Sequence, residues 1–273
     1  MARLNRPAHC RPRVALLLCS AWVAAAAAEP GSTYLFSIPV VPPDPGSATA
    51  GDMARVTLTV TDPGRAAAVI ERGGASQVVA RGVDSITVRQ GLRPTLGGAS
   101  LPQHRAASFV VDFDEAPIGA VMEQLEAAVG PQPDPAALAR FVAAFIDDKS
   151  YLRDFDTASR VARSRTGDCT EHAVLLAALA RAAGWPARIV LGVLILDGDA
   201  GLAAFGHAWT EIHAAAGWEV VDATLPEADP AVRRARYLPL ISLDDEGPGY
   251  GLDLLRLAPA HPARIAIAPA GGP

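Results

Sequence analysis

Three short segments of the chain carry a cysteine, a histidine and an aspartate, in that order. Cys169 lies in Gly-Asp-Cys-Thr-Glu-His, His207 in Gly-His-Ala-Trp, and Asp222 in Trp-Glu-Val-Val-Asp-Ala-Thr. Nucleophilic catalysis by sulfur needs a thiolate, a base that moves its proton, and an acceptor that holds the imidazole in one tautomer. The three residue types can fill these roles in chain order. They predict a cysteine nucleophile.

The first 28 residues have the layout of a secretory signal peptide. A stretch with four arginines precedes an apolar run over 14–28, which ends in an Ala-x-Ala cleavage site. This run is shorter than the ~20 residues that cross a bilayer, so we expect cleavage rather than a permanent anchor. The mature chain is therefore predicted to be secreted or periplasmic, and to meet the membrane only during export.

Cleavage at this site would leave Cys169 as the only cysteine of the mature chain, because Cys10 and Cys19 are removed. A lone thiol is a liability in an oxidising compartment unless it has a use. The alternative is a small buried hydrophobe, the usual fate of a free cysteine. The neighbours of Cys169 favour a loop and a first helical turn over core packing.

The charge balance of the mature chain opposes nucleic-acid binding. Removing the four arginines leaves 20 basic and 29 acidic residues, whereas a nucleic-acid binder is expected to be basic. The only asparagine, Asn5, is also removed. An aspartate or a glutamate must therefore orient any catalytic histidine.

Periodicity divides the mature chain into two parts. Residues 29–114 are rich in turns and in short alternating runs such as 56–61 and 109–113, which predicts a small all-β domain, a sandwich. Residues 115–273 begin with helical spacing over 118–129 and 138–146. We expect this second part to be an α+β catalytic domain.

Capping residues predict where the helices of the second part begin. Asp134 and Pro135 open the helix over 138–146, and Asp156 would cap a short helix that ends near 161. Asp168 would then cap a helix over 169–183. A sulfur in the first turn meets exposed N–H groups and the helix dipole, which would lower its pKa from ~8.5 toward neutrality.

The spacing of His207 and Asp222 predicts a hairpin that brings them together. A strand over 207–213, a turn over 214–217 and a strand over 218–223 place Trp209 opposite Asp222. His207 then lies diagonally from Asp222 on the same face, within hydrogen-bonding reach. A slip of one residue would put them on opposite faces.

Together, the three motifs resemble those of the transglutaminase-like superfamily over 138–226. The resemblance implies a papain-like α+β core in which the cysteine helix packs on an antiparallel sheet. It also implies that Cys169 attacks a carbonyl, that His207 moves the proton and that Asp222 orients His207. The backbone N–H of Cys169 would stabilise the oxyanion, with Tyr151 as a candidate second donor.

Other polar residues have simpler interpretations. His172 could line the cleft, but a place on the helix surface or behind the site is favoured. His207, Glu211 and His213 share one strand face, yet no third or fourth converging ligand is evident, so we expect no metal and no cofactor. Trp209 and Trp218 are expected to pack around His207.

These observations favour an enzyme that transfers acyl groups through a thioester. Its substrates would be peptide or protein amides, and its acceptor would be water, as in a protease or amidase, or an amine, as in a transglutaminase. The alternative is a non-catalytic module that binds the cell envelope on the same scaffold. In a further variant, the β-rich domain binds the envelope and the catalytic domain acts there.

Overall fold

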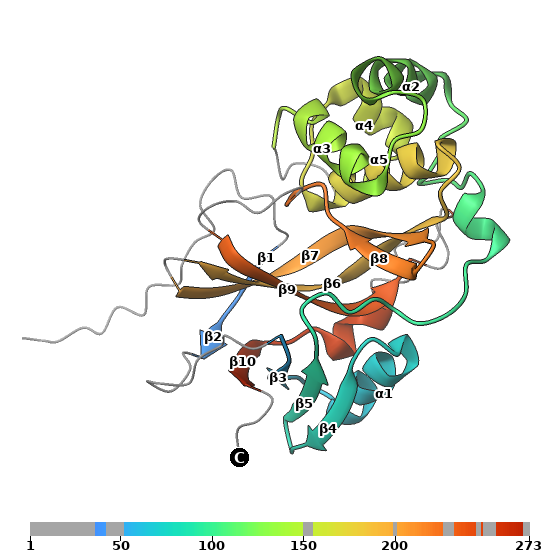
Figure 1. Cartoon of the computed structure of the whole chain (residues 1–273). Coiled ribbons are helices and arrows are strands. Elements are labelled where there is room, and N and C mark those ends of the chain that lie inside the picture. The colour runs from blue at the N-terminus through green and yellow to red at the C-terminus, as the bar shows by residue number, and fades with distance from the viewer. Residues whose placement is uncertain are drawn as a thin grey trace, which may run out of the picture.

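The strands of the protein form two sheets, and Figure 1 shows the first sheet between a group of helices and the second sheet. The computed structural model describes 36–41, 52–149, 155–198, 201–225, 232–243, 247 and 255–269. Within these residues each sheet has five strands. The first contains β1 (Phe36–Ile38), β7 (Gly201–Ala214), β6 (Ala187–Gly198) and β9 (Val232–Ser242) in this order, with β8 (Gly217–Val221) paired to β7.

The second sheet has the order β2 (Val40–Val41), β10 (Arg264–Pro269), β3 (Ala54–Thr59), β5 (Ser85–Gln90) and β4 (Gln77–Arg81). Its pairs are antiparallel except β2 with β10, which is parallel. A helix, α1 (Pro63–Gly73), packs beside it. Two short 3-10 helices, η1 (Pro102–Arg105) and η2 (Ala258–Ala260), lie in connecting segments.

Four helices cover the outer face of the first sheet: α2 (Ala116–Val129), α3 (Pro135–Phe145), α4 (Ala158–Ser164) and α5 (Cys169–Ala182). The predicted helices at 118–129 and 138–146 are confirmed. Asp134 caps α3 as expected, because its Oδ1 accepts a hydrogen bond from the backbone N–H of Ala137 at 2.7 Å. The helix over 169–183 is confirmed as α5, which is buried along nearly its whole length.

The first sheet has an apolar core on each face. On the helical face, side chains such as Ile189 and Leu191 pack with α2 to α5. Farther along the same face of β6, Val193 and Ile195 pack with α1 and the second sheet. On the opposite face, Val190 and Leu194 pack with Trp209 and Tyr237. A strand buried on both faces reads as a continuous apolar run, and this explains the sequence of β6.

The N-terminal part is not built from strands alone, which corrects the expectation of an all-β domain. The strand expected over 56–61 is followed by Asp62 and Pro63, which start α1. The Asp62 carboxylate accepts a hydrogen bond from the N–H of Arg65 at 2.9 Å, and Pro63 stands at the first helical position. The strand expected at 56–61 is present as β3.

The run over 109–113 forms no strand, contrary to its alternating pattern. Val110 and Val111 are buried in the helical core instead. Asp112 in this run accepts hydrogen bonds from Ser159 N at 2.7 Å and Ser159 Oγ at 2.6 Å. Asp112 thus serves the start of α4, where Asp156 was expected, and the residue at the cap is Thr157.

The two ends of the described chain cross over between the sheets: the N-terminal strand β1 belongs to the first sheet, and the C-terminal strand β10 belongs to the second. β1 pairs with β7 of the first sheet, and β10 pairs with β3 of the second. The sheets therefore do not divide the chain at residue 114. Among the described residues, no helix is long and apolar enough to cross a membrane; the proposed signal peptide over 1–28 lies outside them.

Candidate active site

Cys169 is the first residue of α5, and a reciprocal cap fixes this helix start. Asp168 Oδ1 accepts from the N–H of Thr170 at 2.8 Å, and Glu171 Oε2 accepts from the N–H of Asp168 at 3.0 Å. Gly167 is required here, because a Cβ at this position would lie 2.2 Å from the Cβ of Glu171. The predicted cap of the cysteine helix is confirmed.

His207 and Asp222 meet through the predicted hairpin register. β7 and β8 pair His213 with Trp218 and Thr210 with Val221, as the sequence predicts. Asp222 follows the last paired residue, and its Oδ2 lies 2.8 Å from His207 Nε2. The imidazole and the carboxylate therefore share a direct hydrogen bond.

Packing of α5 on β7 brings Cys169 to the same place. The hydroxyl of Thr210 donates to the carbonyl of Ala173 at 2.9 Å and so ties helix to strand. The backbone N–H of Ala208, next to His207, donates a hydrogen bond to the Cys169 sulfur. The structure thus places Cys169 beside the residue that follows His207 in β7.

The three side chains are closed off from solvent. Cys169 is 0% exposed, His207 is 1% exposed and Asp222 is 3% exposed. Burial, together with the charge of Asp168, raises the pKa of the Cys169 thiol well above its usual value. The expectation of a lowered thiol pKa is wrong, because Cys169 is part of the helical core and desolvation outweighs the favourable helix terminus.

The first turn of α5 is also more buried than its composition suggested. Thr170, Glu171 and His172 are all closed off, together with Cys169. The sequence analysis treated a functional first turn and a part of the core as alternatives. In the structure, this segment is the first turn of α5 and is also buried.

Asp222 is held as a carboxylate by its surroundings. Burial alone would raise its pKa, but the charge of His207 and hydrogen bonds from His207 and Thr224 outweigh burial and hold the pKa well below its usual range. Oδ1 accepts from Thr224 N at 2.8 Å and Thr224 Oγ1 at 2.6 Å. Oδ2 accepts from the hydroxyl of Tyr237 at 2.9 Å, beside His207.

Tyr237 and Arg93 are site residues that the sequence interpretation missed. Tyr237 lies on β9, fully buried, and the Arg93 guanidinium carbon lies 5.3 Å from the centroid of its ring. Arg93 also lines a cleft beside Asp222, with Glu219 and Leu225. The available signal was weak: a buried tyrosine needs a partner for its hydroxyl, but no motif names that partner.

The remaining polar candidates have structural partners. His172 is buried, which excludes the helix surface and leaves the other expected place, behind the site; its Nδ1 lies 2.6 Å from the carbonyl of Asp168, and burial lowers its pKa. Glu211 binds Arg188 at 2.6 Å. Within the described ranges, no group of three His, Cys, Asp or Glu could hold a metal ion. Tyr151 lies outside the described residues.

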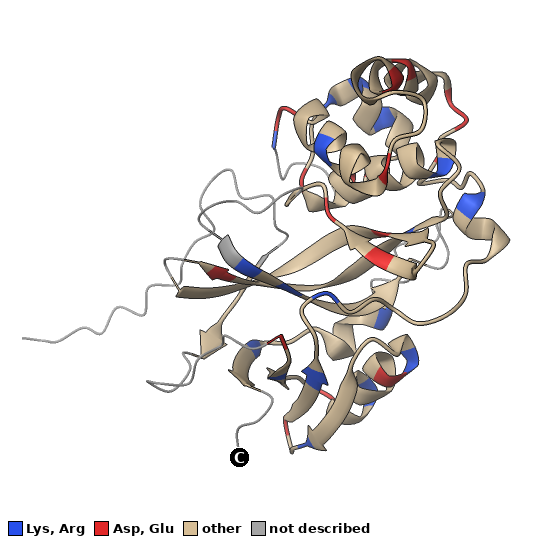
Figure 2. Cartoon of the chain, in the orientation of Figure 1, with Lys and Arg blue, Asp and Glu red and all other residues tan. Residues whose placement is uncertain are grey.

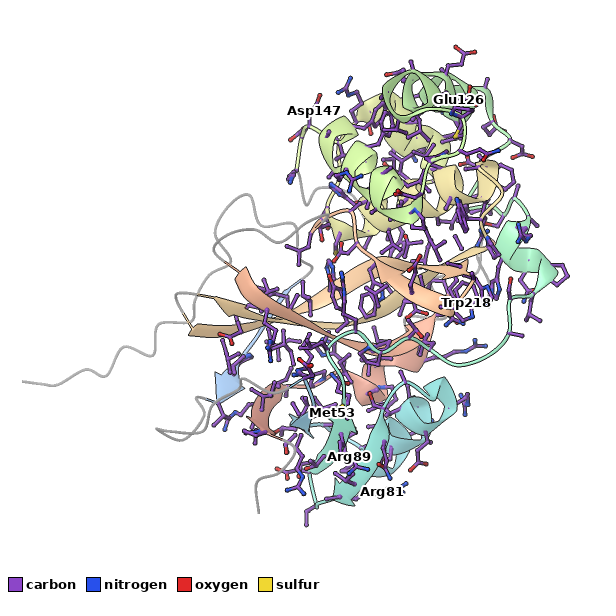
Figure 3. The ribbon with its side chains drawn as sticks, viewed as in Figure 1. Met53, Arg81, Arg89, Glu126, Asp147 and Trp218 are labelled. Carbon is purple, nitrogen blue, oxygen red and sulfur yellow. The ribbon has the colours of Figure 1, made fainter. Side chains whose placement is uncertain are left out.

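The two tryptophans lie in different places. Trp209 stacks near His207, with ring centroids 6.0 Å apart, as expected. Trp218 does not: Figure 3 shows it on the β8 hairpin, where its indole N–H donates to the carbonyl of Gly98 at 2.9 Å. The Arg188 guanidinium carbon lies 3.9 Å from the centroid of a Trp218 ring.

A cysteine helix packed on an antiparallel sheet that carries the histidine defines an α+β protein of the papain-like class. The family comparison is more specific: residues 124–223 match the model of the transglutaminase-like superfamily. The chain therefore contains a transglutaminase-like domain, as the three motifs predicted. This match includes all three site residues.

Comparisons of the whole fold find distant likenesses. A candidate cysteine protease from Cytophaga hutchinsonii is 13% identical, with a TM-score of 0.47, over 80% of this chain and 81% of that one. The periplasmic domain of TgpA from Pseudomonas aeruginosa is 22% identical, with a TM-score of 0.35, over 52% of this chain and 54% of that one. No curated protein matches the sequence.

Proposed function

We propose that the protein is an enzyme of acyl transfer that acts on peptide or protein amide bonds through a thioester on Cys169. The observation that carries this proposal is the 2.8 Å bond between His207 and Asp222, formed beside the first turn of the cysteine helix. The transglutaminase-like domain supports the same reading. No cofactor is needed for this chemistry.

In the proposed reaction, His207 takes the thiol proton as the sulfur of Cys169 bonds to the carbonyl carbon. The Cys169 N–H stabilises the oxyanion, the kind of donor whose removal costs ~3 kcal/mol of transition-state stabilisation. The C–N bond then breaks, and the leaving amine takes the proton from His207. Water or a second amine, deprotonated by His207, attacks the thioester and releases the thiol.

The hydrogen bonds of the imidazole assign its two nitrogens in this proposal. Nε2 is engaged by Asp222, so Nδ1 is the nitrogen that exchanges the proton with sulfur and amine. Asp222 remains a carboxylate, because its pKa is held well below the usual range. It stabilises the imidazolium that forms in each half-reaction.

The cellular setting belongs to the same proposal. The signal peptide predicted over 1–28 would place the mature enzyme in the periplasm or outside the cell, where peptide or protein substrates of the envelope are available. Basic and acidic residues are interspersed along the ribbon in Figure 2. The net charge of the mature chain, with 20 basic and 29 acidic residues, gives no support to a nucleic-acid partner.

The second candidate function is a binding module without catalysis. One observation favours it: Cys169 is fully buried in the helical core, where a structural thiol would also lie. Against it stands the orientation of His207 by Asp222, which a structural thiol does not require.

A substrate panel separates the two functions. Mature protein is incubated with glutamine-containing peptides, with and without hydroxylamine as the acceptor, and products are identified by mass spectrometry. The enzyme proposal expects hydrolysis or hydroxamate formation that disappears in Cys169→Ala and persists in Ser159→Ala, a control outside the site. Equal product from wild type and Cys169→Ala would favour the binding module.

A further inference from the structure

Tyr237 donates a hydrogen bond to the oxygen atom of Asp222 that also binds His207. The phenol oxygen lies 2.9 Å from Asp222 Oδ2, and His207 Nε2 lies 2.8 Å from the same atom. Tyr237 is fully buried. One carboxylate oxygen therefore serves two donors, and only one of them belongs to the predicted set of site residues.

The direction of this hydrogen bond follows from the environment. Burial, and next the negative charge of Asp222, raise the pKa of Tyr237 well above its usual value. The phenol therefore keeps its proton over the working pH range and donates to Asp222. The other carboxylate oxygen accepts from the N–H and the hydroxyl of Thr224, so both oxygens are held in place.

Tyr237 is itself fixed by segments that are distant in the sequence. Its backbone N–H donates to the carbonyl of Leu92 at 2.8 Å, and its carbonyl accepts from Gln90 Nε2 at 3.1 Å. Its ring packs edge-on to Trp209, with centroids 5.2 Å apart, and Arg93 covers it. The phenol cannot leave Asp222 without disturbing these contacts.

We propose that Tyr237 is a positioning residue for the acyl-transfer reaction: it fixes the plane of the Asp222 carboxylate and limits how strongly Asp222 holds the protonated His207. The proposal rests on the proposed function. A carboxylate that accepts a second hydrogen bond attracts an imidazolium less strongly. His207 can then return its proton to the leaving amine.

Several other ionisable groups face this cluster, and the test must leave them in place. Helix α5 contributes Cys169, Asp168 and His172, and Arg93 approaches from the segment after β5. Tyr237→Phe removes one hydroxyl and changes none of these groups. A change in the titration of His207 would therefore report the lost hydrogen bond.

The first measurement is an NMR titration of His207 in mature protein with labelled histidine, assigned by comparison with His207→Ala. Tyr237→Phe is expected to raise the pKa of His207 by about one unit, the size of a single strong hydrogen bond to its partner carboxylate. The matched control is Ser159→Ala, which removes a hydroxyl bound to a different carboxylate, Asp112, at 2.6 Å. It should leave His207 unchanged.

A second variant keeps the experiment decisive if Tyr237→Phe does not fold. Replacing Tyr237 with 3,5-difluorotyrosine keeps the ring and the hydroxyl but makes the phenol a stronger donor. The pKa of His207 should then fall, opposite to the phenylalanine variant. An unmoved His207 in whichever of these variants folds, with only the melting temperature changed, would reduce Tyr237 to a packing role.

Kinetics provide the second readout. Because Tyr237 is buried behind Asp222, its phenylalanine variant should lower kcat about tenfold through lost positioning and leave KM unchanged. The acid limb of the kcat/KM profile should move to higher pH with the pKa of His207. If the mature protein transfers no acyl group, the proposed function fails, but the NMR titration still decides the role of Tyr237.

Discussion

Two opposing effects act on the sulfur of Cys169. The start of a helix stabilises an anion, whereas burial and the negative charges of Asp168 and Asp222 disfavour it. Burial and the acidic neighbours outweigh the helix start, so the pKa of the thiol is raised. The resting thiol is therefore neutral, and its proton must leave during the reaction.

Alkylation tests this balance. We expect iodoacetamide to modify Cys169 in the folded mature protein more slowly than a free thiol at neutral pH, with the rate rising only above the ~8.5 of an ordinary cysteine. Urea-unfolded protein should react at the ordinary rate, and Cys169→Ala should remain unlabelled. Fast labelling that titrates below neutrality would contradict the closed, neutral thiol.

Asp222→Asn tests the orientation of His207. The amide keeps the shape of the side chain but presents a donor or a neutral oxygen to Nε2, so the imidazole loses its stabilising charge. Loss of the acidic partner of a catalytic histidine costs about 10⁴ in kcat in the serine-protease triad, and we expect a similar order in a turnover assay. Asp147→Asn, an exposed change that Figure 3 places at the edge of the helical layer, should retain activity.

At this scale, the sequence predicts what lies within one hairpin or one helix turn. The register of one hairpin brings His207 and Asp222 together, and the helix cap fixes Cys169 at the start of α5. Local sequence patterns are therefore enough to predict these positions. Tyr237 and Arg93 enter from β9 and from the segment after β5. Their contacts depend on strand order across the sheet, which no local spacing encodes.

At the scale of single elements, the cap of α5 links its stability to pH. Glu171 accepts from the N–H groups of Asp156 and Asp168, and burial together with the charge of Asp168 raises its pKa from 4.5 to about 7. A raised acid binds its proton more tightly in the folded state. Its contribution to stability is thus full below the unfolded value and is lost as pH rises through about 7.

The corresponding variant is Glu171→Gln, which resembles the protonated carboxyl. We expect wild-type thermal stability to decline between pH 5 and pH 8, and the decline to be smaller in the glutamine variant. Melting curves over this range make the comparison. Glu126→Gln, an exposed change on α2 in Figure 3, should follow wild type; an equal decline in both variants would locate the effect elsewhere.

Gly192 shows how one strand position controls the site. It pairs with His207 across β6 and β7, and a Cβ there would lie 2.2 Å from the carbonyl oxygen of Leu238 and 2.7 Å from the Trp209 ring. Since the first contact is with backbone, β9 would have to move. Only glycine permits this close approach.

We therefore expect Gly192→Ala to destabilise the fold by about 2 kcal/mol and to lower activity by moving β9 and Trp209. Urea unfolding gives the free energy, and the indole fluorescence should change with it. Gly119→Ala is the matched control: it has open space around its Cβ, lies within α2, and should stabilise by about 0.5–1 kcal/mol. If both variants changed the free energy of unfolding equally, the close contact at Gly192 would not explain the loss of stability.

Elements were predicted best where their signals are local. The helices α2, α3 and α5 follow from apolar spacing and caps, and β7 with β8 follows from turn length. The cap of α4 was assigned to Asp156, but Asp112 is the aspartate that binds Ser159 at the start of this helix. Asp112 lies 47 residues from Ser159 in the chain, so local spacing does not indicate it. Here a tertiary contact supplies what a local cap usually provides.

At the scale of the molecule, the N-terminal part is tied to the sheet that carries the site. The segment 91–101, which follows β5, is anchored by a buried ion pair: Glu211 accepts from Leu96 N at 3.2 Å and binds Arg188. Arg188 in turn donates to the carbonyl of Gly97 at 3.1 Å. Breaking one partner of such a buried pair costs about 3–5 kcal/mol, so this segment belongs structurally to the catalytic half.

If the β-rich domain only bound the envelope, residues 115–273 would have to fold and retain the chemistry alone, but the arrangement of the two sheets opposes this. This fragment lacks β1 to β5, so β10 loses both of its neighbours, β2 and β3, and Ile265 and Leu238 lose the apolar layer that covers them. Each such side chain contributes ~1.5–3 kcal/mol on burial, against a total stability of ~5–15 kcal/mol. Exposing several of these side chains would therefore cost as much free energy as the whole fold gains.

We expect the 115–273 fragment to aggregate or to unfold without a cooperative transition, whereas the mature chain 29–273 unfolds cooperatively. Calorimetry and circular dichroism distinguish these states. Adding residues 29–114 as a separate polypeptide during refolding should restore the transition, because it returns β1, the other four strands of the second sheet and the Leu96 anchor. A fragment that melts cooperatively at the temperature of the mature chain would show that the strands that cross over are dispensable and that the two parts are independent.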